Sequence, residues 1–136
     1  MSTRGAYGFR MGGKQWIVYN QYDSYFEGLG QSVANWATKY TPEEVKKVLP
    51  EVEIYDQDEI NDDLFSFLVS KKMSDDSDFL DDKLFCEYSY ILDVDKKQMI
   101  TFVNAYDLEF VLPWDDKIAA AFKSKSFEVK KEYRNY

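Results

Sequence analysis

Two strand–turn–strand patterns, one near each end of the chain, constrain the fold more than any other feature. Residues 6–10 and 15–20 are rich in aromatic and β-branched side chains, and Gly12-Gly13 between them supplies the positive φ angles of a hairpin turn. Residues 84–93 alternate between apolar and polar side chains, and residues 98–104 return as a partner strand. Two hairpins favour an antiparallel sheet over a parallel, doubly wound one.

Helical patterns occupy much of the chain between and after these hairpins. Residues 31–40 place apolar side chains at positions i, i+3, i+4 and i+7, which is one face of a helix. Thr41-Pro42-Glu43-Glu44 has the residues that start a helix, and Pro50 ends that helix. Apolar residues share one side of residues 57–72, which predicts a third helix, and Pro113–Phe122 predicts a fourth.

The remaining segments complete the predicted architecture. Glu51–Tyr55 is a short strand or linker, 73–82 an acidic loop, 107–112 a further strand, and 127–133 a last strand or a basic tail. We therefore expect an α+β fold in a single domain over residues 1–136. Its mainly antiparallel sheet is built from N- and C-terminal hairpins and is covered by three to four helices.

Composition excludes several chemistries. The chain has 136 residues, and its 45% hydrophobic content is enough to bury a core. It contains no histidine, so nucleophile activation by histidine and histidine metal sites are ruled out. The single cysteine, Cys86, cannot form an intramolecular disulfide, and its place on an apolar strand face predicts an inert thiol. We expect neither a cofactor nor a metal site.

The net charge of −8 is concentrated in one segment. Residues 1–50 carry six basic and four acidic side chains, residues 51–82 two and twelve, and residues 83–136 nine of each. This acidic field makes direct nucleic-acid binding unfavourable and favours a basic partner, whereas a solvated acidic face is the plainer interpretation. The aspartates of residues 75–82 could attract a hard cation, but their spacing matches no loop with defined ligands.

Other global features suggest location and assembly. No apolar run approaches the roughly 18 residues of a membrane span, and no signal peptide is recognisable. With a lone thiol, this predicts a cytoplasmic protein that does not bind membranes. The chain also has eleven tyrosines and three tryptophans, which favour interfaces and raise the prospect of a homo-oligomer.

The N-terminal third contains the densest group of candidate site residues. Residues 21–30 read as a loop that joins the first hairpin to a helix, and aromatic loop residues are unusual in solvent. The candidate ligand-binding residues in and around this loop are Arg4, Asn20, Asp23, Ser24, Tyr25, Gly28 and Gly30. In the structural alternative, the loop is a glycine hinge, Arg4 pairs with Asp23 and the tyrosines belong to the core.

Residues Thr3-Arg4-Gly5, Tyr19-Asn20, Asp23-Ser24-Tyr25 and Gly28-Leu29-Gly30 together resemble an uncharacterised family of small proteins from bacteriophages, bacteria and large viruses. The similarity covers about the first 30 residues and continues faintly in Glu87–Thr101. It implies a phage or accessory-gene origin, in which case the protein would act in the cytoplasm of a host cell.

A weaker resemblance is to N-terminal-nucleophile hydrolases of the choloylglycine-hydrolase type. Ser2-Thr3 stands where those enzymes begin with Cys-Thr, and Asn20 and Asp23 follow the hairpin. The resemblance implies that, after removal of Met1, the free amine of Ser2 would serve as base for its own hydroxyl. The chain departs from the pattern in its serine nucleophile, in Tyr19 at the place of an arginine, in the Asn20–Asp23 spacing and in its shorter length.

These features lead to one main hypothesis and two alternatives. The main hypothesis is a small acidic, non-catalytic binding protein, such as a phage-encoded inhibitor or modulator that binds a host protein or a small ligand. The first alternative is an amidohydrolase-like enzyme with Ser2 as its nucleophile. The second is an acidic mimic of nucleic acid.

Overall fold

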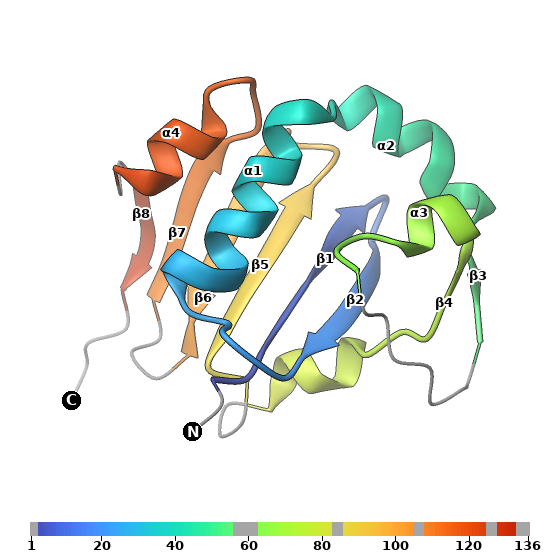
Figure 1. The fold of residues 1–136 in the computed structure, drawn as a ribbon, viewed down its shortest axis with the longest axis horizontal. Coiled ribbons are helices and arrows are strands. Elements are labelled where there is room, and N and C mark those ends of the chain that lie inside the picture. Colours follow the sequence, from blue (N-terminus) through green and yellow to red (C-terminus); the bar gives the residue numbers. More distant parts are fainter. Residues whose placement is uncertain (1–2, 56–62, 83–85, 105–107, 125–127, 133–136) are drawn as a thin grey trace.

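A computed structural model describes residues 3–55, 63–82, 86–104, 108–124 and 128–132. In this part of the chain, six strands form one sheet in the order β2-β1-β5-β6-β7-β8 (Figure 1). Their bounds are β1 Gly5–Met11, β2 Lys14–Asn20, β5 Tyr88–Asp93, β6 Gln98–Val103, β7 Leu108–Pro113 and β8 Glu128–Glu132. The strands β3 (Glu53–Ile54) and β4 (Lys72–Met73) pair separately and in parallel. The predicted α+β fold with a mainly antiparallel sheet is confirmed.

Four α-helices and three π or 3₁₀ turns accompany the strands in the described ranges. The α-helices are α1 Gln31–Lys39, α2 Pro42–Val48, α3 Phe67–Ser70 and α4 Ile118–Lys123. The turns are η1 Phe26–Gly30, which is of the π type, and the 3₁₀ turns η2 Leu49–Glu51 and η3 Ser77–Asp81. Figure 1 shows α1 and α4 side by side over one face of the large sheet, and they are in contact. No helix among the described residues has the length and apolarity needed to cross a bilayer.

The N-terminal hairpin forms as predicted. Gly12 and Gly13 turn the chain with φ angles of 58° and 79°, a conformation that costs glycine little. β1 and β2 pair antiparallel from Gly5↔Asn20 to Met11↔Lys14. On its other side β1 runs parallel to β5, the one parallel pair in the described sheet. The sheet is therefore mixed, because this pairing joins two hairpins that lie far apart in the sequence.

The main core lies between the sheet and its covering helices. Alternate residues of the strands point toward the helices, including Phe9 of β1, Tyr90 of β5 and Met99 of β6. Val33 of α1 and Phe122 of α4 belong to the same core and pack on the helix side of these strand residues. The opposite sheet face carries a smaller apolar cluster of Ala6, Ile17, Cys86, Ile91 and Ile100, against which Phe79 and Leu80 of η3 pack. The sheet thus buries apolar side chains on both faces.

The second predicted helix is confirmed down to its cap. The hydroxyl of Thr41 accepts a hydrogen bond from the Glu44 backbone N–H at 3.2 Å, and Pro42 occupies the first turn. A cap of this kind satisfies an N–H that has no partner within the helix. Pro50 lies in η2, so the chain leaves the α-helix there as a 3₁₀ turn.

The predicted third helix over residues 57–72 is wrong in its described part, and residues 57–62 lie outside the described ranges. Only Phe67–Ser70 is helical, and Lys72–Met73 forms β4. Phe65 and Lys71 have φ angles of 56° and 59°, which break a right-handed helix on both sides. Phe65 and Phe67 are both buried, at a spacing of two that no single helix face provides.

Two other predictions need correction, and one open alternative is resolved. The strand predicted over 84–93 begins at Tyr88 in the described residues, and it is buried on both faces, because Tyr90 and Leu92 belong to the main core and Ile91 to the cluster on the opposite face. Pro113 ends β7, and α4 starts only at Ile118. Residues 128–132 form β8, so the strand interpretation of the C-terminal segment holds over these residues.

The acidic segment over 73–82 is not simply a solvated loop. Asp75 Oδ1 accepts a hydrogen bond from Ile17 N at 3.1 Å, and Asp76 Oδ2 accepts one from Tyr19 N at 2.9 Å. Asp76 N in turn donates to Ile17 O at 2.8 Å. These contacts satisfy the outer edge of β2, which would otherwise present unpaired backbone groups.

Candidate functional site

The predicted loop between β2 and α1 is held together by its own polar groups. The Asn20 side-chain amide donates to Ser24 Oγ at 2.8 Å, and Ser24 Oγ donates to Asn20 O at 3.3 Å. Ser24 is fully buried, its N–H donates to Thr3 O at 3.2 Å, and its carbonyl accepts from the Tyr90 hydroxyl at 2.7 Å. Ser24 therefore ties the loop to β5 and to the segment before β1, and Asn20 ties it to the end of β2. This bonding supports the structural interpretation for Ser24.

Asp23 and Gly28 shape the turn of this loop. Asp23 has a φ angle of 53°, and its carbonyl accepts a hydrogen bond from Leu29 N at 2.7 Å. A Cβ on Gly28 would lie 2.1 Å from Asp23 O, so only glycine permits this close approach. The Tyr25 hydroxyl donates to Asp23 Oδ1 at 3.2 Å, and the negative charge of Asp23 raises the pKa of Tyr25.

Arg4 and Gly30 have different surroundings. The Arg4 N–H donates to Glu87 Oε2 at 3.0 Å, and Arg4 O accepts from Glu87 N at 3.1 Å, which anchors the chain start to β5. Gly30 is buried at the start of α1, where a Cβ would lie 2.6 Å from Phe122 Cζ. Among the described lining residues of the hollow beside the loop, Asn20, Asp23 and Gly28 are present, whereas Arg4, Ser24, Tyr25 and Gly30 are not.

This hollow, here called the loop pocket, has a volume of about 310 Å³. Its described lining residues are Tyr7, Asn20, Tyr22, Asp23, Gly28, Leu29, Ser32 and Leu64. Tyr22 is 64% exposed, so its ring is available to a ligand. Burial raises the pKa of Tyr7 to about 12, so this phenol stays neutral. Asp23 is the only charged side chain in the described lining.

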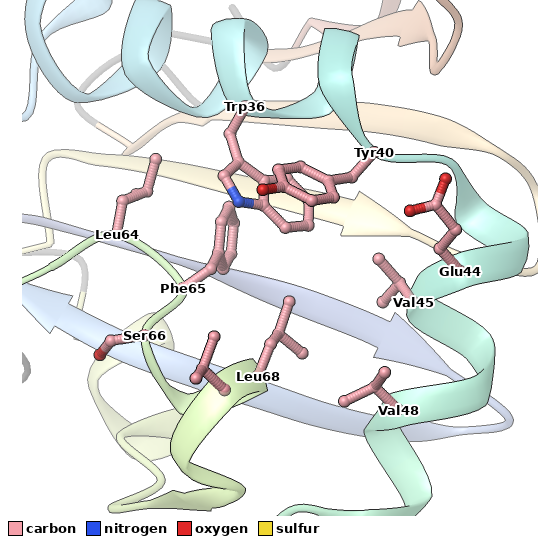
Figure 2. Close-up of a pocket in the computed structure, with 10 residues that line it drawn as sticks. Trp36, Tyr40, Glu44, Val45, Val48, Leu64, Phe65, Ser66 and Leu68 are labelled. Atoms are coloured by element: carbon pink, nitrogen blue, oxygen red, sulfur yellow. The ribbon is translucent and has the colours of Figure 1, made fainter.

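A second and larger hollow, here called the aromatic pocket, was not predicted as a site. It has a volume of about 440 Å³ and opens between α1, α2 and the segment that leads into α3 (Figure 2). Its lining residues are Trp36, Tyr40, Glu44, Val45, Val48, Leu64, Phe65, Ser66, Leu68 and Val69. Helical spacing alone placed Trp36 and Tyr40 on an apolar core face.

The aromatic pocket takes its shape from three rings. Trp36 and Tyr40 stack with their ring centroids 4.5 Å apart and their planes at 23°, and Phe65 lies 4.4 Å from Trp36 (Figure 2). Tyr40 is 44% exposed and Val69 is 88% exposed, so apolar surface continues to the rim. The sequence does contain a signal for this pocket. Tyr40 is the last residue of the predicted apolar helix face, and Thr41, the next residue, caps α2, so this aromatic residue lies at the junction of two helices.

The two pockets adjoin and share one electrostatic character. Leu64 lines both of them, so its side chain separates the two hollows. Glu44 is the only charged side chain in the described lining of the aromatic pocket, as Asp23 is in the loop pocket. Neither described lining includes a lysine or an arginine. Both pockets therefore favour a positively charged group over a negatively charged one.

Metal and thiol chemistry find little support in the described residues. No group of three or more acidic or cysteine side chains within them is arranged to hold a metal ion. Asp75 and Asp76 are instead engaged with the edge of β2. Cys86 is buried, and burial raises the pKa of its thiol to about 12, which keeps it protonated and unreactive. Ser2, the nucleophile of the hydrolase alternative, lies outside the described residues.

Compared with protein families, curated proteins and solved structures, this chain shows no match.

Proposed function

We propose that this protein is a non-catalytic binding protein whose aromatic pocket receives an apolar, positively charged segment of a partner protein. The observation that carries the proposal is the stacked Trp36–Tyr40 pair over an apolar hollow of about 440 Å³ with Glu44 at its side. Large aromatic side chains at a concave surface are typical binding hot spots. The exposed side chain of Val69 extends the apolar contact beyond the pocket.

Charge supports the basic nature of this partner. The whole chain has a net charge of −8, and residues 51–82 carry twelve acidic side chains against two basic ones. The residues of that segment that line the aromatic pocket, 64–66, 68 and 69, are uncharged, so the segment's acidic charge acts on a partner from a distance. An acidic surface speeds encounter with a basic partner and discriminates against acidic ones. A phage origin, which we expect from the first 30 residues, would make this partner a host protein.

Synthetic peptides provide a direct test. The probe is a peptide with a central Leu-Phe pair flanked by lysines, compared with a version flanked by glutamates and one in which Ser-Asn replaces Leu-Phe. Saturable binding of the first peptide alone is the expected result in calorimetric titration. Binding of none of them, or equal binding of the lysine and glutamate versions, would contradict the proposal.

A pair of neighbouring substitutions locates the binding surface. Val69→Asn removes an exposed apolar contact without adding charge, and Ser70→Asn places the same side chain one residue away, outside the described lining. Both side chains are exposed, and an asparagine at residue 70 can still donate to Lys72 O and accept from Lys72 N as Ser70 Oγ does, so neither change should unfold the protein. Val69→Asn should weaken peptide binding about tenfold, whereas Ser70→Asn should leave it unchanged. Equal effects would place the peptide elsewhere.

The amidohydrolase remains a second candidate, and one contact favours it. Ser24 N donates to Thr3 O at 3.2 Å, so the start of the described chain lies beside the loop that contains Asp23. The mechanism requires a free amine on Ser2. Intact-mass measurement after incubation with a p-nitrophenyl ester should then show an acyl adduct that Ser2→Ala abolishes. Retention of Met1, or an adduct that persists in the variant, would exclude the enzyme.

A further inference from the structure

A third hollow lies on the face of the sheet opposite α1 and α4. It has a volume of about 330 Å³ and is formed between η3 and the strands β1, β2, β5 and β6. We call it the far-face pocket. Its described lining residues are Arg10, Gln15, Ser77, Asp78, Leu80, Asp81, Ser89, Phe102 and Asn104. Its size is at the small end of ligand pockets, which span roughly 300–1,000 Å³.

Ser89 provides the first sign that this pocket is built for a ligand. The residue is only 2% exposed, and its hydroxyl makes no hydrogen bond to another described residue. Every fully buried side-chain polar atom in the described structure has a hydrogen-bond partner. The Ser89 oxygen therefore keeps a small accessible surface, and that surface faces the pocket that Ser89 lines. A nearly buried hydroxyl with unused hydrogen-bonding capacity favours a polar ligand group.

Arg10 provides the second sign. It is half-buried, lines the same pocket and forms no ion pair with any described residue. Its register partner on β5 is Asp93, whose Oδ1 already accepts a hydrogen bond from Lys96 N at 2.9 Å. A partly desolvated guanidinium has five donors in a planar fork, which is suited to a carboxylate. Arg10 is thus available to a bound carboxylate.

The remaining charges limit which carboxylates fit. Asp78 and Asp81 of η3 line the pocket and are exposed, so they oppose a ligand that is only anionic. A ligand that is only cationic would be repelled by the positive charge of Arg10. A small zwitterion satisfies both signs, with its carboxylate at Arg10 and Ser89 and its ammonium at the aspartates. Leu80 and Phe102 add apolar surface for a side chain.

We propose that the far-face pocket binds a free α-amino acid. This inference is independent of the proposed function, because the two sites lie on opposite faces of the sheet and their described linings share no residue. An amino acid bound here would contact both η3 and the sheet. It would therefore stabilise the folded protein by mass action and hold the acidic segment against β2.

Thermal unfolding with a panel of the free amino acids tests this inference, followed by calorimetric titration of the best binder. At least one amino acid should raise the melting temperature saturably at concentrations up to about 10 mM. The matching amine without the carboxylate and the matching acid without the amine should each bind at least about tenfold more weakly. If no amino acid binds, or if either half-molecule binds as tightly, the inference is wrong.

Variants then place the ligand. Arg10→Gln should weaken binding about tenfold or more, because a hydrogen bond to a charged group is lost. Lys14→Gln removes the same charge from the same hairpin at an exposed residue outside the described lining, so it should bind like the wild type. Ser89→Ala should weaken binding without unfolding the protein, since its hydroxyl bonds to no described group. Wild-type affinity in Arg10→Gln would overturn the inference.

Discussion

At the scale of single residues, the loop between β2 and α1 depends on a few side chains that bond to the loop's own groups. Asn20 is one of them, because its amide donates to Ser24 Oγ and to the Tyr22 carbonyl. We expect Asn20→Ala to lower the free energy of unfolding by about 1 kcal/mol, since Ser24 Oγ and the Tyr22 carbonyl lose the amide that donates to both. Urea unfolding measures this loss. Gln21→Ala, at an exposed neighbour, should change stability by no more than about 0.5 kcal/mol.

Gly28 tests the shape of the same loop. A Cβ there would lie 2.1 Å from Asp23 O, whereas a Cβ on Gly12 would have no heavy atom within 4 Å. Gly12→Ala should therefore cost only the strain of its left-handed backbone, about 1–2 kcal/mol. Gly28→Ala must also displace the loop and should cost more than Gly12→Ala in thermal unfolding. Equal losses would show that the loop adjusts freely.

These residues show what local sequence could reveal about the site. The polar and aromatic residues in and around the loop 21–30 predicted ligand-binding residues, and three of these, Asn20, Asp23 and Gly28, line a hollow. The local sequence could not separate ligand-facing residues from structural ones. Ser24, for example, is buried by contacts with Thr3 and Tyr90, which lie far away in the sequence. The pairing of Arg4 with Glu87 depends on the β1–β5 contact in the same way.

At the scale of elements, Asp76 joins the acidic segment to the edge of β2. Burial raises the pKa of Asp76, and the charge of Asp75 adds to this, although the Tyr19 N–H opposes it. A raised pKa means that the folded state binds a proton more tightly than the unfolded state does. Asp76 therefore adds to the free energy of unfolding at low pH, and this contribution is lost as the pH rises through the folded-state pKa of Asp76.

Asp76→Asn should separate the charge from the hydrogen bond. Asparagine keeps an oxygen that accepts from Tyr19 N but carries no charge, so it should be at least as stable as the wild type at pH 7. That advantage should shrink as pH falls toward about 4, where aspartates protonate. Asp76→Ala should lose about 1–3 kcal/mol through the unpaired edge. An Asn variant as unstable as the Ala variant in urea unfolding at pH 7 would contradict this account.

Trp114 connects β7 to the end of α1. Its indole N–H donates to Ala37 O at 3.0 Å and to Tyr40 O at 2.9 Å, the carbonyl oxygens of residues at and just beyond the last turn of α1. We expect Trp114→Phe to cost about 1–3 kcal/mol, because buried carbonyls lose their donor. The near-ultraviolet circular dichroism spectrum should also change, because the aromatic rings of Trp36 and Tyr40 lie at this end of α1. An unchanged stability would show that water replaces the indole.

Element prediction succeeded where short-range rules decide the outcome. The Gly12-Gly13 turn and the Thr41 cap are local, and both were predictable. The helix predicted over 57–72 failed because Phe65 adopts a left-handed backbone and packs against Trp36, a contact between distant segments. The parallel β1–β5 pair was equally beyond local pattern, because it joins the first hairpin to the second.

At the scale of the whole molecule, the acidic surface and the aromatic pocket together predict how peptide affinity depends on salt concentration. Binding of the basic peptide should weaken as salt rises, because charge steers it to the pocket, but apolar burial should preserve part of the affinity. A nucleic-acid mimic instead predicts a partner whose binding falls by orders of magnitude between about 50 and 200 mM salt. Titration at two salt concentrations distinguishes these cases.

The most direct test of the proposed function is titration of the lysine-flanked peptide into the wild type and Glu44→Gln. Glutamine at this position still suits the Thr41 cap, so the variant removes charge from the aromatic pocket while preserving α2. The account predicts saturable binding to the wild type and an affinity roughly two- to fivefold weaker in the variant. Equal affinity, or no binding to either protein, would contradict it.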